Sequence, residues 1–242
     1  MKINRFWEEW ENKTKLEKKY IISLEKAVIW ISQQSFFKDI QAVYVKGSFV
    51  FRELNEKSDI DLVPIVKTND VLDKVRALRD AHKEELNPAS ILPMSIQELK
   101  ENELYAKSEL KGQPDNFVLL LPYHKLVYGK PINPEGCKVR PLEKIKDDLR
   151  SGFVKKLIPM YKKREFGFTQ LMKKYPHLAY WEERINGKVF APSWKAILKA
   201  RPGDDLLQQA AEFRFHPTKN KRKREKFIKD LEEYLSRKEI IR

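Results

Sequence analysis

Apolar positions at two different spacings mark the first elements of the chain. Spacings of three and four, with charged residues between them, run through residues 4–34 and predict a helix. Short apolar runs at residues 42–46 and 60–66 are typical of strands instead. The chain therefore opens with a helix followed by two strands.

The next elements continue the alternation of helix and strand. Residues 68–86 have a helical apolar stripe behind Thr68 or Asn69 as N-cap, and "ASILPMS" at 89–95 predicts a third strand. Ser95, with a glutamate three residues on, predicts a capping box and another helix. This order predicts an α+β fold class, in which a small mixed-sheet domain comes first.

The remainder of the chain is predicted to be mostly helical. After Pro141 the pattern is helical to the end, so we predict two domains, residues 1–135 and residues 141–242. The helical part should be interrupted where helix-breaking residues gather. These places are Pro159, Pro176, Gly187–Pro192, Pro202–Gly203 and Pro217.

Charge is distributed unevenly between the two parts. The 242 residues carry a net charge of +14, of which residues 1–140 contribute +2 and residues 141–242 contribute +12. Such asymmetry favours an anionic partner for the second part, although lysine-rich helix faces can also serve solubility. A basic cluster stands out at a predicted helix start, where positive charge opposes the helix dipole and a polyphosphate would compensate it. Its members are Lys219, Lys221, Arg222, Lys223, Arg224 and Lys226.

Several function classes are disfavoured by composition. No run of eighteen apolar residues exists, so no membrane span is predicted. The single cysteine, Cys137, excludes an intramolecular disulfide and a cysteine-based zinc cluster, and it fits a reducing cytoplasm. Four scattered histidines argue against a zinc site. We therefore expect a cytoplasmic protein.

Two carboxylates lie at the start of the second predicted strand. Asp59 and Asp61 are two residues apart, so on a strand both side chains face one side while Ile60 faces the core. Two like charges this close repel each other unless a cation lies between them. A hard divalent ion such as Mg²⁺, shared with substrate phosphates, is the cation that fits.

Gly47 and Ser48 follow the first predicted strand. Glycine lets the backbone approach a ligand closely, and Ser48 offers a hydroxyl and a backbone N–H to a phosphate oxygen. A short helix starting at Phe49 would add its dipole. A phosphate cradle facing a metal site is the layout for in-line phosphoryl or nucleotidyl transfer.

The motif resembles that of the DNA polymerase β-like nucleotidyltransferase superfamily. Gly-Ser, ten residues, then Asp-x-Asp followed by aliphatic residues is similar to its signature, and "SDIDL" looks most like the minimal and aminoglycoside-type members. The resemblance covers residues 47–61 by motif and extends to about residue 130 by element order. It implies a polymerase β-like palm, with Asp59 and Asp61 binding Mg²⁺ or Mn²⁺ and Gly47 and Ser48 holding the triphosphate of ATP or another NTP.

The sequence departs from the family pattern in two places. Many members have Arg-Gly soon after Gly-Ser, whereas here Arg52 comes one place late and the glycine is absent. The third carboxylate expected on the next strand is missing: Asn87, Ala89 and Ser90 occupy that region. Glu84 or Glu85 could substitute for it from the preceding helix, although we expect both to be solvated.

These observations predict a Mg²⁺-dependent nucleotidyltransferase that moves an NMP from an NTP to a hydroxyl acceptor. Because residues 141–242 are basic, the favoured acceptor is RNA, such as a tRNA. One alternative is transfer to a small molecule or a protein. Another is a non-catalytic nucleic-acid-binding or toxin–antitoxin-type module, which the missing third carboxylate would explain.

Overall fold

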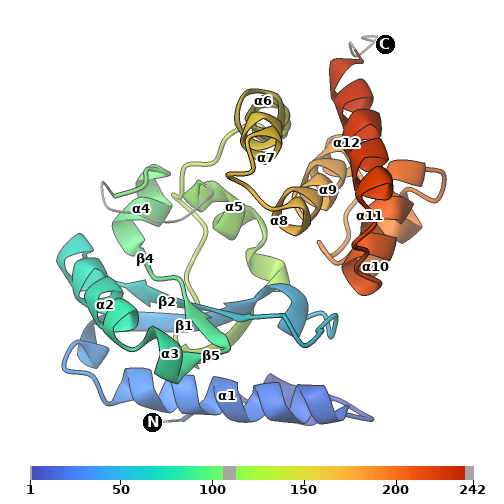
Figure 1. Cartoon of the computed structure of the whole chain (residues 1–242). Helices are drawn as coiled ribbons and strands as arrows, with labels where there is room; N and C mark the ends of the chain where they lie inside the picture. Colours follow the sequence, from blue (N-terminus) through green and yellow to red (C-terminus); the bar gives the residue numbers. More distant parts are fainter. Residues whose placement is uncertain (1, 106–112, 238–242) are drawn as a thin grey trace. The chain divides into compact units, whose positions relative to one another are not determined.

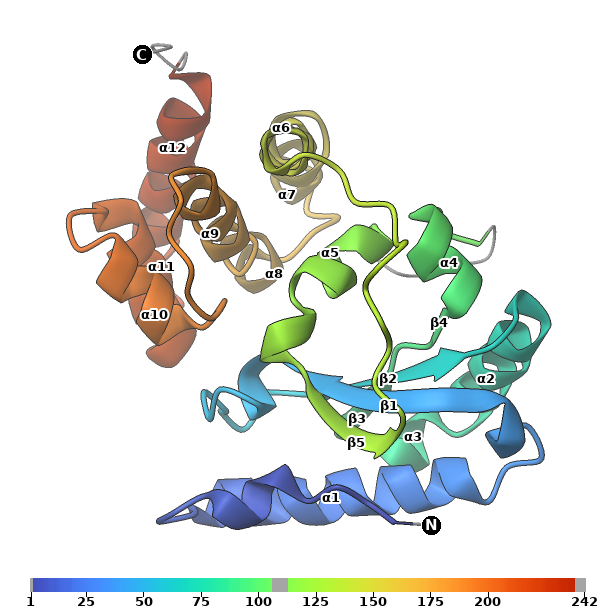
Figure 2. The ribbon, with the colours of Figure 1, turned by 180° about the vertical axis from the view of Figure 1, so that it is seen from behind.

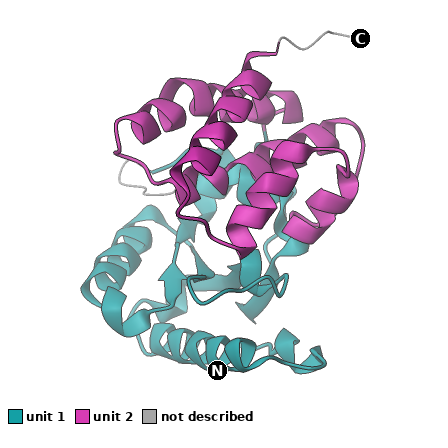
Figure 3. Cartoon of the chain, turned by 45° about the vertical axis from the view of Figure 1, so that its right-hand side comes forward, with its two compact units in different colours: residues 1–139 teal, residues 140–242 magenta. Residues whose placement is uncertain are grey.

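The computed structural model of the chain describes residues 2–105 and 113–237. It divides into two compact units, residues 1–139 and residues 140–242, which are coloured separately in Figure 3. No helix in the described part of the chain is long and apolar enough to cross a membrane.

Unit 1 is built on a mixed five-stranded sheet (Figure 1). The strands lie in the order β3-β2-β1-β5, and β4 also pairs with β2. β1 is antiparallel to β2 and β5, whereas β3 and β4 are parallel to β2. The strands are β1 (Ile40–Lys46), β2 (Ile60–Val66), β3 (Ala89–Ile91), β4 (Met94–Ser95) and β5 (Lys125–Gly129). The sheet and the helices around it confirm the predicted α+β class.

Helices cover both faces of this sheet (Figures 1 and 2). On one face, Val43, Val45 and Ile60 pack in the same core as Leu24 and Val28 of α1. On the other face, strand residues with the opposite parity pack in a second core with α4 and α5. The helices of unit 1 are α1 (Lys15–Ser32), α2 (Asn69–Ala81), α3 (Lys83–Leu86), α4 (Ile96–Glu101) and α5 (Pro114–Leu119).

The single helix predicted over residues 4–34 is wrong at its start. A 3-10 turn, Phe6–Glu9, comes first, and α1 begins only at Lys15. Thr14 caps α1: its hydroxyl accepts from the Glu17 N–H at 3.1 Å, and the Glu17 carboxylate accepts from the Thr14 N–H at 2.7 Å. This capping box fixes the helix start, so the earlier apolar residues pack as a separate turn.

Two other segments are divided more finely than their patterns predict. The strand predicted at 89–95 is split into β3 and β4, which pair with successive parts of β2. The helix predicted at 68–86 is interrupted at His82 between α2 and α3. The capping box at Ser95 is confirmed, because Ser95 and Glu98 exchange hydrogen bonds of 3.0 and 2.9 Å.

Unit 2 is helical, in agreement with the predicted fold class. Pro159 does not break the chain's helical path, since α6 continues through a π-helical turn, Phe153–Leu157, into α7. The rings of Phe168, Phe213 and Phe227 pack edge to face in its core. The helices are α6 (Leu142–Gly152), α7 (Ile158–Lys162), α8 (Phe168–Met172), α9 (Tyr175–Ile185), α10 (Trp194–Ala200), α11 (Asp205–Phe215) and α12 (Lys221–Ser236).

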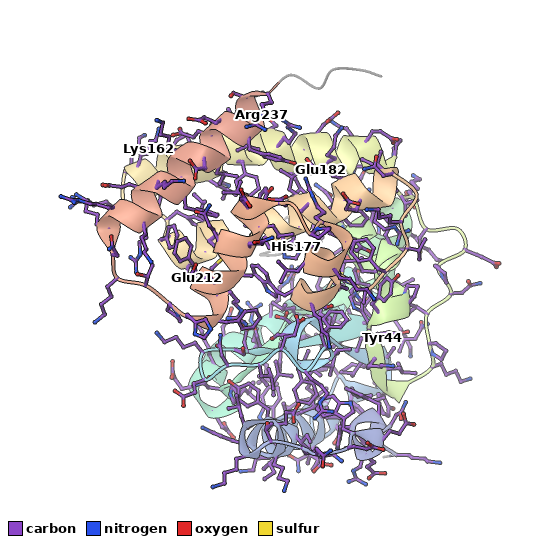
Figure 4. The ribbon with its side chains drawn as sticks, turned by 90° about the vertical axis from the view of Figure 1, so that its right-hand side faces the viewer. Tyr44, Lys162, His177, Glu182, Glu212 and Arg237 are labelled. Atoms are coloured by element: carbon purple, nitrogen blue, oxygen red, sulfur yellow. The ribbon has the colours of Figure 1, made fainter. Side chains whose placement is uncertain are left out.

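A part-buried polar network ties the helices of unit 2 together. Arg201 Nη1 lies 2.6 Å from Glu182 Oε2, and Arg201 Nε lies 3.2 Å from Asp204 Oδ2. The Tyr234 hydroxyl donates to Glu182, labelled on α9 in Figure 4, and the Tyr175 hydroxyl donates to Asp204 at 2.8 Å. Burial, together with the neighbouring acidic groups, raises the pKa of both tyrosines. We call these five residues the unit 2 network.

Candidate active site

The two predicted carboxylates lie at one end of the sheet in unit 1. Asp59 is exposed and directly precedes β2, while Asp61 is the second residue of β2 and its side chain is 25% exposed. Ile60 between them is fully buried in the core on the α1 face, as its position in the motif predicted. Asp61 therefore faces away from the α1 core.

Gly47 is brought against Asp61 by the pairing of β1 and β2. Lys46, the last residue of β1, is opposite Asp61, and Gly47 follows it. Gly47 has φ +75°, and a Cβ atom placed on it would lie 3.0 Å from Asp61 Oδ2. Both the backbone conformation and this close approach favour glycine here. The predicted phosphate turn and the predicted metal ligand are thus neighbours, as the motif requires.

The turn after β1 is shorter than the helix predicted from Phe49. A single 3-10 turn, Gly47–Phe49, is followed by Arg52 at φ +57°, where the helical path ends. Phe49 is fully buried and anchors the turn in the α1 core. The Glu53 N–H donates to the Ser48 carbonyl at 2.9 Å. Ser48 is therefore held in a closed turn and directly follows Gly47, the residue that lies against Asp61.

Arg52 anchors this turn to α1. Its Nε and Nη2 atoms lie 2.7 and 3.1 Å from the two carboxylate oxygens of Glu17, and its guanidinium lies over the Trp10 ring at 5.3 Å. The hydrogen bond from Arg52 lowers the pKa of the Glu17 carboxyl. This arginine holds the turn in place by an ion pair with a buried carboxylate.

The position expected for a third carboxylate is occupied by serine. On β3, Ser90 is the register partner of Asp61. Glu84 and Glu85 on α3 are exposed, and the Glu85 carboxylate contacts His82 Nδ1 at 2.9 Å. The prediction that β3 carries no acid is confirmed, and the exposure of both glutamates agrees with the expectation that they are solvated.

Two residues that the sequence did not single out complete a polar row across the sheet. Lys46 Nζ lies 3.4 Å from Asp61 Oδ2. His124 directly precedes β5, whose Lys125 pairs with Val45, so His124 follows the register to the position beside Lys46. The row thus runs from Ser90 through Asp61 and Lys46 to His124. A lysine at the end of an apolar strand was the available signal for Lys46, but His124 is placed only by the pairing of β5.

His124 is partly buried, and its ring nitrogens are enclosed. Neither nitrogen has a hydrogen-bond partner in the described part of the chain. The imidazole packs on the Phe117 ring at a centroid distance of 4.7 Å. Burial, and secondarily the charge of Lys46, lowers the pKa of His124 to about 3. His124 is therefore neutral at physiological pH.

The residues of this site fit a metal that shares its coordination with a substrate. Among the described residues, no group of three or more His, Cys, Asp and Glu side chains could hold a metal ion. Asp59 and Asp61 supply oxygen atoms alone, and the absent side chain of Gly47 leaves space against Asp61 Oδ2. Mg²⁺ and Mn²⁺ suit oxygen ligands, and Mg²⁺ is usually bound by one or two carboxylates together with phosphates and water.

The basic cluster lies at the start of α12 in unit 2, and half of it is engaged within the unit. Lys221 and Lys226 pair with Glu225 and Asp230 at 3.6 and 2.6 Å, as i,i+4 neighbours. Arg224 donates to the Thr218 carbonyl and lies over a phenylalanine ring. The other members are exposed and have no ion pair with any described residue: Lys219, Arg222 and Lys223.

Comparison with known proteins identifies the fold. No family model and no curated protein matches the sequence. A solved structure does match: spectinomycin adenyltransferase AAD(9) from Enterococcus faecialis, with a TM-score of 0.59 and 15% sequence identity. The match covers 91% of this chain and 99% of that protein, whose crystal structure contains ATP and spectinomycin. At this identity the match shows the fold, and it confirms the resemblance to nucleotidyltransferases at that level.

Proposed function

We propose that the chain is a Mg²⁺- or Mn²⁺-dependent nucleotidyltransferase that takes an NMP from ATP or another NTP. In this proposal Asp59 and Asp61 bind the metal, and Gly47 and Ser48 bind the β- and γ-phosphates. The approach of Gly47 to Asp61 carries the proposal, because a Cβ atom added to the glycine would lie only 3.0 Å from Asp61 Oδ2, where a nucleotide and a metal would share ligands.

The proposed reaction is an in-line displacement at the α-phosphorus. The acceptor hydroxyl oxygen forms a bond to phosphorus, the bond from that phosphorus to the β-phosphate oxygen breaks, and pyrophosphate leaves. The acceptor proton passes to water, since Ser90 replaces the carboxylate that could take it. A bound divalent ion supplies charge neutralisation on the phosphates and the leaving group. Gly47 and Ser48 position the triphosphate through backbone N–H groups and a hydroxyl.

We propose a small hydroxyl-bearing molecule as the first candidate acceptor. The fold neighbour, which binds spectinomycin, matches along both units of this chain, so the helical unit belongs to the shared architecture. Glu182 and Asp204 are engaged internally in the unit 2 network, and residues 141–242 carry +12. These charges favour a neutral or anionic small molecule over a polycation.

RNA is the second candidate acceptor, and it was the one favoured by the sequence. The observation that supports it is the set of three exposed cations without ion pairs, Lys219, Arg222 and Lys223. Half of the basic cluster is engaged within unit 2, which weakens the case for RNA relative to its appearance in the sequence. The cytoplasm, where either acceptor and NTPs are present, remains our predicted location.

The test is transfer of label from each α-labelled NTP in the presence of Mg²⁺. The protein is incubated with total cellular RNA in one series and with a metabolite extract depleted of macromolecules in another. Label in small products would support the first acceptor class, and label in RNA would support the second. A Lys219→Gln/Arg222→Gln/Lys223→Gln variant should lose RNA labelling but keep small-molecule labelling.

Absence of label in every series would overturn the proposed transfer. If the protein then bound RNA with a steep dependence on salt, the remaining alternative would be a non-catalytic nucleic-acid-binding module.

A further inference from the structure

Lys46 lies at the candidate active site, although it is not part of the Gly-Ser and Asp-x-Asp motif. It is the last residue of β1, directly before Gly47, and its register partner is Asp61. Its side chain faces the sheet side away from the α1 core, because it shares the parity of Ala42 and Tyr44. The ammonium group therefore lies on the side of the sheet where the proposed metal and triphosphate meet.

The ion pair between Lys46 and Asp61 is weak enough for Lys46 to change its partner. Nζ lies 3.4 Å from Asp61 Oδ2, and the two side chains are 31% and 25% exposed. Contact at this distance is a weak hydrogen bond, so the pair is held mainly by charge. Both groups remain accessible to solvent and to a ligand.

Beyond its ion pair with Asp61, Lys46 makes no second ion pair with any residue that the structure describes. Its other neighbour in the row, His124, is a neutral imidazole that cannot balance the ammonium charge. When a divalent ion binds Asp61, Lys46 is repelled by that ion and loses its partner.

A triphosphate beside Gly47 and Ser48 would supply the missing negative charge. Lysine binds phosphate as a point charge on a flexible stem, so a rotamer change can carry Nζ from a carboxylate to a phosphate. We infer that Lys46 is a phosphate-binding residue that occupies Asp61 in the metal-free protein and is released to the nucleotide when the divalent ion binds. This inference rests on the proposed function, since it assumes that Asp61 is a metal ligand.

The inference makes two predictions of opposite sign for one variant. Lys46→Met removes the charge and keeps most of the length. Without nucleotide, the variant should bind Mn²⁺ about tenfold more tightly, because no ammonium competes for Asp61. With Mn²⁺ present, it should bind α,β-methylene ATP about tenfold more weakly, because a phosphate ligand is lost.

The experiment measures Mn²⁺ binding by electron paramagnetic resonance and nucleotide binding by calorimetry on the full chain. Lys125→Met is the matched control, since Lys125 is an exposed lysine near the same end of the sheet but pairs with Val45 on the other face. It should change neither constant. Circular dichroism verifies folding, and Lys46→Gln, with the same expected signs, replaces the methionine variant if that one does not fold.

The outcomes separate this inference from the proposed function. If Asp61→Asn leaves Mn²⁺ binding unchanged, the proposed metal site fails, and the inference fails with it. If Asp61→Asn abolishes Mn²⁺ binding but Lys46→Met behaves like Lys125→Met, only the role of Lys46 is overturned. Weaker Mn²⁺ binding by Lys46→Met would also overturn it, because the lysine would then support the metal site.

Discussion

Two charged clusters in this protein differ in how completely their members are satisfied. In unit 2, Arg201 contacts Glu182 at 2.6 Å and Asp204 at 3.2 Å. Two tyrosine hydroxyls donate hydrogen bonds to the same two carboxylates. In unit 1, the polar row at the end of the sheet includes a 3.4 Å ion pair and a histidine that has no hydrogen bond to any described residue. We call the first the closed cluster, because its charged groups contact one another. We call the second the open cluster, because its ion pair is long and partly exposed.

The difference indicates what each cluster is for. A buried network whose partners are all present fixes the packing of helices, and removing one member leaves an unpaired charge inside the protein. A partly exposed carboxylate and a lysine that contacts it at 3.4 Å contribute little to stability, and both remain accessible to a ligand. Variants in the open cluster should therefore change function, and variants in the closed cluster should change stability.

The largest expected effect is on transfer, from Asp61→Asn. The amide keeps the shape of the carboxylate but removes the charge that would bind the metal, so we expect transfer to fall about 1,000-fold, with little change in the free energy of unfolding. The measurement is the rate of pyrophosphate release from ATP with the accepted substrate. Asp70→Asn, at an exposed carboxylate in the first turn of α2, is the control and should keep full activity.

The opposite pattern is expected in the closed cluster. Arg201→Met leaves Asp204 without its cation and leaves Glu182 with only Arg150 Nη1 at 3.9 Å, so the free energy of unfolding should fall by about 3 kcal/mol. Urea unfolding measures it, beside the exposed control Lys199→Met in the same helix region. Equal stability of the two variants would show that the unit 2 network does not hold the helices together.

His124 tests whether a member of the open row can nevertheless affect stability. Its pKa of about 3 in the folded chain lies below the 6.5 of the unfolded chain, so the unfolded chain binds more protons between these values. Stability therefore falls as pH decreases from 6.5, by about 2 kcal/mol at pH 5 from this residue.

The variant His124→Phe should remove this part of the pH dependence. The free energy of unfolding is measured for both proteins at pH 8 and pH 5. Between these pH values it should fall by about 2 kcal/mol more in the wild type than in the variant. His216→Phe, at an exposed position in unit 2, serves as the comparison. An unchanged pH dependence in His124→Phe would mean that folding does not lower the pKa of this imidazole.

The smallest expected effect comes from Gly47→Ala, and Gly136 offers a matched control. Both glycines have positive φ, +75° and +80°, so alanine should cost about 1 kcal/mol at either position. Only Gly47 has Asp61 Oδ2 at 3.0 Å from the added Cβ, whereas Gly136 has open space. Transfer should fall about tenfold in Gly47→Ala alone, since a displaced carboxylate misplaces the metal. Equal transfer activity in both variants would show that the close approach of Gly47 to Asp61 is not needed for transfer.

The local parts of the candidate site could be predicted from the sequence. The alternation along β2 predicts that Asp61 faces away from the α1 core, and the burial of Ile60 follows from the same alternation. The absence of an acid on β3 was also visible in the sequence. Each of these features depends on residues close together in the chain.

Features set by tertiary pairing could not be predicted in this way. Lys46 meets Asp61 through the register of β1 with β2, and His124 reaches the row through β5. Arg52 finds Glu17 35 positions away, because the capping box at Thr14 starts α1 and leaves Glu17 in its first turn. The basic cluster is another example. Its sequence predicts cations that are available to an anionic partner, but two of them form ion pairs with acidic residues of α12.

The most direct test of the central claim is a crystal structure of the protein with Mn²⁺ and α,β-methylene ATP, with the metal located by its anomalous scattering. The account predicts one or more Mn²⁺ ions bound to oxygens of Asp59 and Asp61 and of the analogue, whose β- and γ-phosphates contact Gly47 and Ser48. An analogue bound elsewhere, or Mn²⁺ without contact to either aspartate, would contradict the assignment of this site to nucleotidyl transfer.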